Sequence, residues 1–242
     1  YLVNTSTTSD TYATLVVAGT TQARLWNSSA ATTTVAATAS LYSQDHANVA
    51  GDLYIWGAYS KTNANDHWSY ATDFDGTALG GSSRKVDVYL DSGASVTVTG
   101  GTLAVYGSAT ASTTIQNQGS GSYGLMVGGS ASSTFNYYEI RDIDSDGLVL
   151  TGSPTIGSLS YGDLEVSQNG GTAITVGGMT IDQNPAKNFN LNRFALNGVA
   201  SGFNVTATGT SVSSWRFVNH YGDRDGEAYD VDPDGDPGYV AW

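Results

Sequence analysis

Short β-type segments, divided by glycine-rich turns, are the feature of this sequence that most restricts how it folds. From Lys85 onward, runs such as KVDVYL, TLAVYG and YGLMV alternate with stretches of Gly, Ser, Asn and Asp. Thr, Val and Tyr recur within the runs, and no stretch repeats apolar residues at a helical period. Several runs end in double glycines, which supply the positive φ that a sharp bend requires. The sequence therefore predicts an all-β fold.

Apolar residues alternate along these runs, so one face of each strand is predicted to be buried. Successive units begin near Lys85, Thr102, Tyr123, Leu148 and Thr172. Their irregular spacing lies near the range of ~20–29 residues that is typical of solenoids, in which repeats stack and share a core. We expect stacked parallel strands, although a β-sandwich explains the same alternation and stays an alternative. The residues predicted to be buried are Val86, Val88, Val96, Val98, Leu103, Val105, Ile174 and Val176.

The pattern over residues 85–218 resembles the right-handed parallel β-helix proteins. That superfamily includes polysaccharide lyases, phage tailspikes, adhesins and bacterial surface proteins, so the resemblance implies a right-handed parallel β-helix. The closing run GDPGY-x-x-W, residues 235–242, is similar to the ends of modules in long repetitive secreted proteins of bacteria. This second resemblance implies export and use as a surface module, and it identifies no activity.

The two ends of the chain differ from the middle in composition. Residues 1–84 hold two uncharged β segments, Thr11–Thr20 and Thr32–Tyr42, followed by an aromatic-rich stretch from Leu53 to Gly76. We expect this part to be an N-terminal strand and a cap or lateral hairpin over one end of the solenoid, since terminal coils need covers. Residues 219–242 are predicted to be an acidic C-terminal segment of the same structural unit.

Charge and composition exclude several classes of partner. The chain has 9 basic and 22 acidic residues, a formal net charge of −13. Nucleic acids and anionic membranes both require a basic surface, so neither is an expected partner. No apolar run approaches the ~20 residues that span a bilayer. Cysteine is absent, which excludes disulfides and thiolate metal sites. Richness in Ser, Thr and Gly fits an extracellular or cell-surface protein.

Two segments match the pattern D-x-D-x-D-G, in which alternate carboxylates converge in a tight loop and suit a calcium ion. The first segment contains Asp142, Asp144 and Asp146, and the second contains Asp230, Asp232 and Asp234, followed by Asp236. The bidentate Glu that an EF-hand has at loop position twelve is replaced by Ser153 and Ala241. The sequence predicts structural calcium at these aspartates, with acidic, solvated turns as the alternative.

No catalytic motif is present, and we expect a protein that is not an enzyme. The three histidines share no metal-ligand spacing. Asp73 and Asp75 lie behind Trp68 and Tyr70 and are the carboxylates that a glycan-cleaving site would use. Against that reading, the nine basic residues form no cluster that would hold an anionic glycan. The aromatic stretch is either a small core beneath a long loop or a sugar-binding surface.

These observations favour a structural role. We expect the chain to be a subunit of an extracellular filament or cell-surface layer that assembles head to tail with copies of itself. The uncharged segment Thr11–Thr20 is a suitable strand to donate to the open sheet edge of a neighbour. It is also suited to form the first coil of its own solenoid. A surface module that binds cell-surface glycans and a polysaccharide-active β-helix enzyme are the alternative functions.

Overall fold

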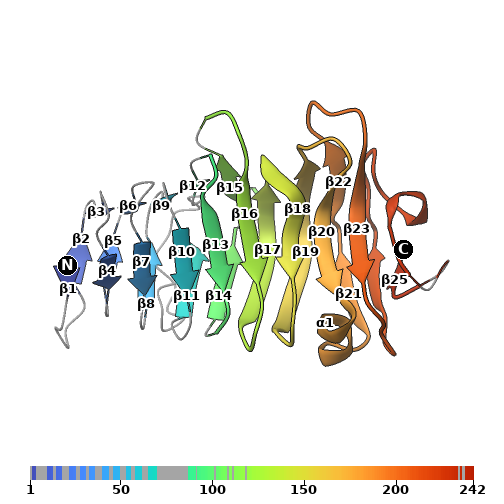
Figure 1. Cartoon of the computed structure of the whole chain (residues 1–242), viewed down its shortest axis with the longest axis horizontal. Helices are drawn as coiled ribbons and strands as arrows, with labels where there is room; N and C mark the ends of the chain where they lie inside the picture. Colours follow the sequence, from blue (N-terminus) through green and yellow to red (C-terminus); the bar gives the residue numbers. More distant parts are fainter. Residues whose placement is uncertain are drawn as a thin grey trace.

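The computed structural model of this chain is a parallel β-solenoid, as the sequence predicted, with β1 (Leu2–Val3) and β25 (Val240–Ala241) at opposite ends (Figure 1). Between Leu2 and Ser69 the structure describes only the strands and how they pair. From residue 87 to residue 242 it describes the whole chain apart from residues 91, 101, 108, 111, 118, 234, 236 and 237. Every strand pair in these described parts is parallel, which excludes the antiparallel β-sandwich.

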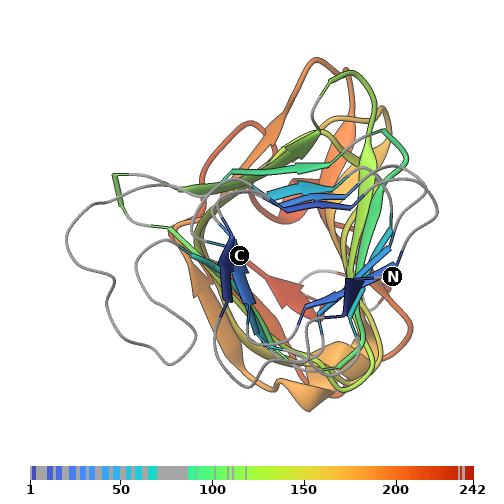
Figure 2. The ribbon, with the colours of Figure 1, turned by 90° about the vertical axis from the view of Figure 1, so that its left-hand side faces the viewer.

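Three faces of parallel strands surround the core, and they are visible when the molecule is viewed along its axis (Figure 2). Face A is one nine-stranded sheet. Its strands, in spatial order, are β1 (Leu2–Val3), β4 (Gln22–Leu25), β7 (Ser40–Ser43), β10 (Ala58–Lys61), β13 (Ser95–Val98), β16 (Tyr123–Val127), β18 (Ile143–Leu150), β20 (Gly171–Gly177) and β23 (Gly202–Thr208).

Faces B and C are joined through long strands that run along both of them. Face B contains β2 (Asp10–Tyr12), β5 (Ser28–Ala30), β8 (His46–Val49), β11 (Asn65–Ser69), β14 (Thr102–Tyr106) and the first halves of β17 (Ser132–Ile140) and β19 (Thr155–Val166). Face C contains β3 (Leu15–Val17), β6 (Thr33–Val35), β9 (Leu53–Ile55), β12 (Asp87–Leu90), β15 (Thr113–Asn117), the second halves of β17 and β19, and β22 (Arg193–Leu196). A third, short sheet consists of β21 (Lys187–Asn190), β24 (Trp215–Val218) and β25 (Val240–Ala241). Its first strand, β21, lies against β19.

Most coils are longer than the sequence units suggested. In face A, Val96 pairs with Leu125, Leu125 with Leu148, Leu148 with Ile174, and Ile174 with Val205. The intervals between these partners mostly exceed those between the predicted unit starts. Each predicted unit contained two β runs. A coil has three strands, one for each face, so the predicted units were too short.

The buried face of each strand was predicted well. Seven of the eight predicted core residues are fully buried, and Val86 lies outside the described residues. Ala104 lies between the buried residues Leu103 and Val105, and it is buried too, which strict alternation does not explain. Stacking of coil on coil is what makes one continuous core from these short strands.

The N-terminal region differs from the expected cap or lateral hairpin. Its described strands continue the three faces in parallel: β1 pairs with β4, β2 with β5, and β3 with β6. The segment expected to be donated to a neighbour contributes to β2 and contains β3, so it lies in the first coil of its own chain. The aromatic-rich stretch contains strands β9, β10 and β11. Asp73 and Asp75 lie outside the described residues.

The C-terminal segment forms a last, partial coil. Tyr221 bridges to Arg193 on face C, Val231 bridges to Thr206 on face A, and β25 pairs with β24. Two short helices, α1 (Gly178–Gln183) and η1 (Glu227–Tyr229), connect strands near this end. The indole of Trp242 stacks on the ring of Phe217, with 5.0 Å between centroids and 21° between planes.

Candidate functional site

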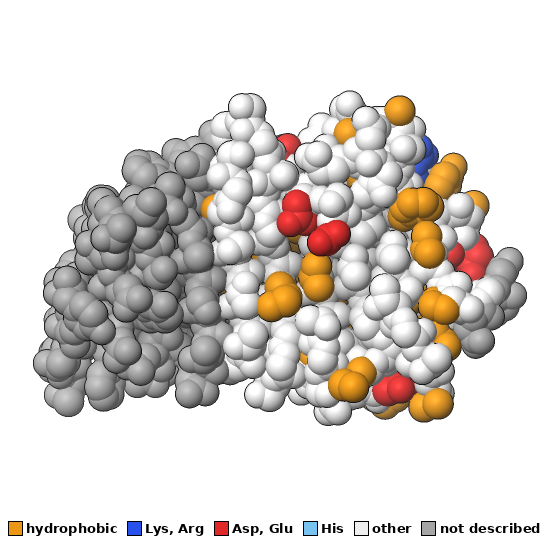
Figure 3. All heavy atoms as spheres, in the orientation of Figure 1, with side chains coloured by type: hydrophobic (Ala, Val, Ile, Leu, Met, Phe, Trp, Pro, Cys, Tyr) orange, Lys and Arg blue, Asp and Glu red, His pale blue; other side chains and the backbone are white. Residues whose placement is uncertain are grey.

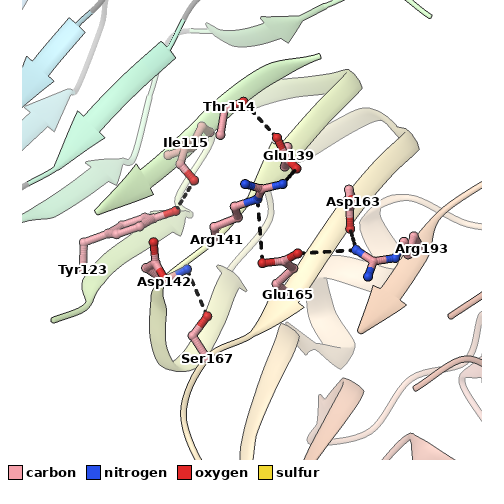
Figure 4. Close-up of polar contacts among 10 residues, drawn as sticks. All are labelled: Thr114, Ile115, Tyr123, Glu139, Arg141, Asp142, Asp163, Glu165, Ser167 and Arg193. Carbon is pink, nitrogen blue, oxygen red and sulfur yellow. Dashed lines mark hydrogen bonds and ion pairs between the residues drawn. The ribbon is translucent and has the colours of Figure 1, made fainter. Parts of the chain in front are cut away.

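Five charged residues on face C form what we call the charge ladder: Glu139, Arg141, Asp163, Glu165 and Arg193 (Figure 4). Strand register places Glu139, Asp163 and Arg193 in one row across β17, β19 and β22. Arg141 follows β17, and Glu165 stands two residues beyond Asp163. Side chains at alternate positions of a strand share a face, so the five lie together on the outside of the sheet.

The two arginines each connect carboxylates from different coils. Arg141 Nη2 pairs with Glu139 Oε1, and its Nε lies 3.7 Å from Glu165 Oε2. Arg193 Nη1 lies 2.7 Å from Asp163 Oδ1 and 3.4 Å from Glu165 Oε1. The hydroxyl of Thr114 on the preceding coil donates to Glu139 Oε2 at 3.0 Å (Figure 4). The ladder therefore links successive coils of face C.

Partial burial sets the electrostatics of the ladder. Burial raises the pKa of Glu165, an effect that Arg141 opposes and Asp163 reinforces. Burial alone would lower the pKa of Arg193, but the hydrogen bond and the charge of Asp163, together with Glu165, raise it above its usual value. Each of the three carboxylates has an arginine partner, so the arrangement suits the fixing of coil register better than proton transfer.

The ladder was not predicted from the sequence. The sequence feature that could have indicated the ladder is the spacing of its aligned residues, first from Glu139 to Asp163 and then from Asp163 to Arg193. Those two intervals differ in length, so they become meaningful only once the strand register is known.

The first predicted calcium segment lies on a bulged strand. Tyr123 of β16 pairs with Ile143 of β18, and Leu125 pairs with Leu148. Strand β18 therefore has extra residues between Ile143 and Leu148 that lack a counterpart in β16. Gly147 allows the bulge because its φ is +66°, and an added Cβ would lie 2.3 Å from the carbonyl oxygen of Thr172.

Two hydrogen bonds involve the three aspartates of this segment. The N–H of Asp142 donates to Ser167 Oγ at 3.0 Å (Figure 4), and Asp144 Oδ1 accepts from the N–H of Asp146 at 3.1 Å. Burial raises the pKa of Asp142 and Asp144. No group of three or more His, Asp or Glu side chains that would hold a metal ion occurs among the described residues. Calcium at this segment stays a prediction.

The second predicted segment covers the last coil. Asp230 Oδ2 accepts from the indole N–H of Trp242 at 3.0 Å, and Asp232 Oδ2 accepts from the N–H of Val240 at 2.9 Å. Nearby, Asp223 Oδ1 accepts from the N–H of Leu196 at 3.0 Å. Asp234 and Asp236 lie outside the described residues. The carboxylates thus satisfy N–H groups at the end of the solenoid, a role that the sequence reasoning did not assign to them.

Neither the fold nor the ladder identifies a relative by itself. No helix in the described part of the chain has the length and apolarity needed to span a bilayer. A scan against protein-family models, a search of curated proteins and a search of solved structures each found no match to this chain.

Proposed function

We propose that this chain is a structural unit of an extracellular filament or surface layer, and that copies of it associate head to tail. The observation that supports this is the parallel solenoid itself, because a stack of like coils presents strand edges only at its two ends. In the described structure, β1, β2 and β3 each pair on one side. Their residues include one charged side chain, Asp10. A strand edge with so little charge is a surface on which a further strand pairs readily.

The opposite end exposes residues of the last coil. Tyr221 and Val231, the bridging residues of the last coil, are 50% and 40% exposed. The two ends have different residues, so contact between them is heterologous and propagates into a fibre rather than closing as a dimer. The face seen in Figure 3 is largely neutral and polar in its described part, with scattered acidic and apolar side chains. Such a flank favours contact through the ends over contact side by side.

A pair of proline substitutions in β3 tests the assembly. The N–H groups of neighbouring residues in a strand point to opposite sides, so one of Val16→Pro and Val17→Pro removes a donor at the outer edge. The other removes a donor that faces β6, where Val16 pairs with Thr34 and Val17 with Val35. We expect the outer-edge variant to stop polymerisation with an unchanged melting temperature, and its neighbour to lower that temperature.

Sedimentation velocity and negative-stain microscopy over a range of concentrations give the readout. Intact chain that stays monomeric at every concentration, with and without calcium, would rule out the filament. Polymers that form equally well from both proline variants would show that this edge takes no part in the contact.

Calcium bound at the aspartate segments would stabilise such an extracellular unit. A ligand held only by the folded chain, at ~100 times its Kd, contributes about 2.7 kcal/mol. We therefore expect the melting temperature to rise with added calcium and to fall with chelator, while magnesium, which requires a tighter octahedral site, has a smaller effect. Identical melting curves in calcium and in chelator would contradict this prediction.

A further inference from the structure

Large side chains occupy a strained backbone position at the corner between faces B and C. Tyr137, Tyr161 and Leu191 have φ of 53°, 59° and 55°, and Asn219 follows at 55°. The register aligns the two tyrosines, because Asn136 pairs with Ser160 and Tyr138 with Gly162 on either side of them. The N–H of Leu191 donates to the carbonyl of Val218, beside Asn219, at 3.0 Å. The same corner is therefore repeated on four successive coils.

The residues found at this corner are energetically unfavourable in its left-handed backbone conformation. A left-handed conformation is unfavourable for a residue with a Cβ, while glycine adopts it freely and asparagine at small cost. This chain uses glycine at eleven other described positions with positive φ. Two tyrosines and a leucine at the corner therefore lower stability where glycine or asparagine would not. Strain of this kind is found where a side chain serves a binding role.

The corner borders a groove of about 290 Å³, here called the corner groove. Its lining includes Tyr137, Tyr138, Tyr161, Asp163, Leu191 and Tyr221. Its volume is near the lower end of the range for small-ligand sites. The lining residues come from successive coils, from β17 to the bridge at Tyr221, so the groove runs along the solenoid axis. Three coil steps of ~4.8 Å give it a length of roughly 14 Å.

The walls of the corner groove are aromatic and rigid. The rings of Tyr137 and Tyr161 stack with 4.5 Å between centroids and 16° between planes. Leu191 is 42% exposed and Tyr221 is 50% exposed. Tyrosine supplies broad contact area and a hydroxyl at a small entropic cost, and stacking reduces that cost further. The groove thus combines apolar surface with hydroxyl groups.

Charge restricts what the groove accepts. Asp163 is the one acidic residue in its lining, and its Oδ1 is paired with Arg193 Nη1 at 2.7 Å. A cation would have to compete with that arginine for the carboxylate. An anion would be repelled by a chain of net charge −13. A neutral ligand meets neither obstacle.

We propose that the corner groove binds a neutral glycan chain. Sugar rings have apolar C–H faces and hydroxyl rims, which match the tyrosine rings and phenol groups of the groove. Its extension along the axis fits a short oligosaccharide better than a single ring. The groove reaches the end surface at Tyr221, but Tyr137, Tyr161 and Leu191 lie on the flank of the solenoid, so binding to them operates in a monomer as well as in a filament.

Substitution of Tyr161 by asparagine separates binding from folding. Asparagine relieves the left-handed strain while the stacked pair is lost, and these two effects on stability oppose each other. We expect the melting temperature of Tyr161→Asn to stay within a few degrees of the wild type, while glycan binding falls at least ~10-fold. Leu191→Asn should also weaken binding without lowering the melting temperature. Phe203→Asn is the matched control, because Phe203 is 39% exposed on face A, outside the groove.

The probes are cellohexaose, maltohexaose and chitohexaose, titrated by calorimetry, with saturation-transfer NMR to detect contact. Binding of at least one probe with a millimolar or smaller Kd, lost in Tyr161→Asn and kept in Phe203→Asn, supports the proposal. Absence of binding to all three probes at millimolar concentration overturns it, as does unchanged binding by Tyr161→Asn. Tighter binding of hexagalacturonate than of any neutral probe overturns the assignment to neutral glycans.

Discussion

Replacing Asn184 by aspartate should lower the free energy of unfolding by about 3–5 kcal/mol at neutral pH. Asn184 is buried and connects three parts of the fold. Its Oδ1 accepts from the N–H of Ile156 at 2.7 Å, and its Nδ2 donates to the carbonyls of Pro154 and Thr180 at 2.8 and 2.9 Å. An aspartate of the same shape keeps the acceptor but turns a buried negative charge toward two carbonyl oxygens.

The loss should depend on pH in a defined direction. Burial and the two carbonyls raise the pKa of the new carboxyl above ~3.9, its value in the unfolded chain. The destabilisation is therefore present in full above the raised pKa and decreases as the pH falls through it, because the neutral acid can donate to one carbonyl. Urea denaturation of variant and wild type at about pH 7 and about pH 5 measures this difference. The control is Asn188→Asp, an exposed position in β21. Equal effects of the two substitutions would contradict our account of Asn184.

Truncation of Trp215 to alanine should cost about 3–5 kcal/mol. The side chain is fully buried in β24, its ring contacts Phe189 edge to face at 5.1 Å, and its indole N–H donates to the carbonyl of Asn184 at 2.9 Å. Removal leaves a cavity between the last coils and an unpaired carbonyl. Chemical denaturation gives the loss in stability, and Arg216→Ala, exposed on the same strand, is the control with an expected change below ~0.5 kcal/mol.

Trp215 and Asn184 share a hydrogen bond, so their effects should not add. The double variant Asn184→Asp, Trp215→Ala should lose less stability than the two single losses combined, with a coupling of about 0.5–3 kcal/mol. Strict additivity would mean that the bond between Trp215 Nε1 and the carbonyl of Asn184 contributes nothing measurable.

Alternation is a local property, and this is why the buried faces could be predicted from the sequence. Val96 and Val98 flank one residue of the opposite orientation, and burial follows from that pattern whatever the rest of the chain does. The length of a coil is not local. Strand β12 pairs with β15, with Val88 opposite Ile115, and nothing within either run specifies the length of chain between those two residues.

The aspartate segments show a second limit of sequence reasoning. The pattern D-x-D-x-D-G predicts a tight loop, yet Asp144 and Asp146 lie in the bulge of strand β18, and the residues on either side of the bulge pair with neighbouring coils. Thr175 on the next coil donates to the carbonyl of Asp146 at 2.7 Å. The charge ladder and the left-handed corner were missed for the same reason, since both depend on which residues the stacking aligns.

The direction of the strand pairing has a mechanical consequence. Hydrogen bonds between coils run along the solenoid axis, and the two ends of the chain lie at opposite ends of that axis (Figure 1). Tension applied through the ends therefore acts first on the hydrogen bonds of the outermost coil, and those between the next two coils are loaded only after it has detached. The coils would then be released singly, and each would add on the order of 100 Å of extended chain. A layer built from such units would yield under load by stepwise extension and keep its remaining coils folded.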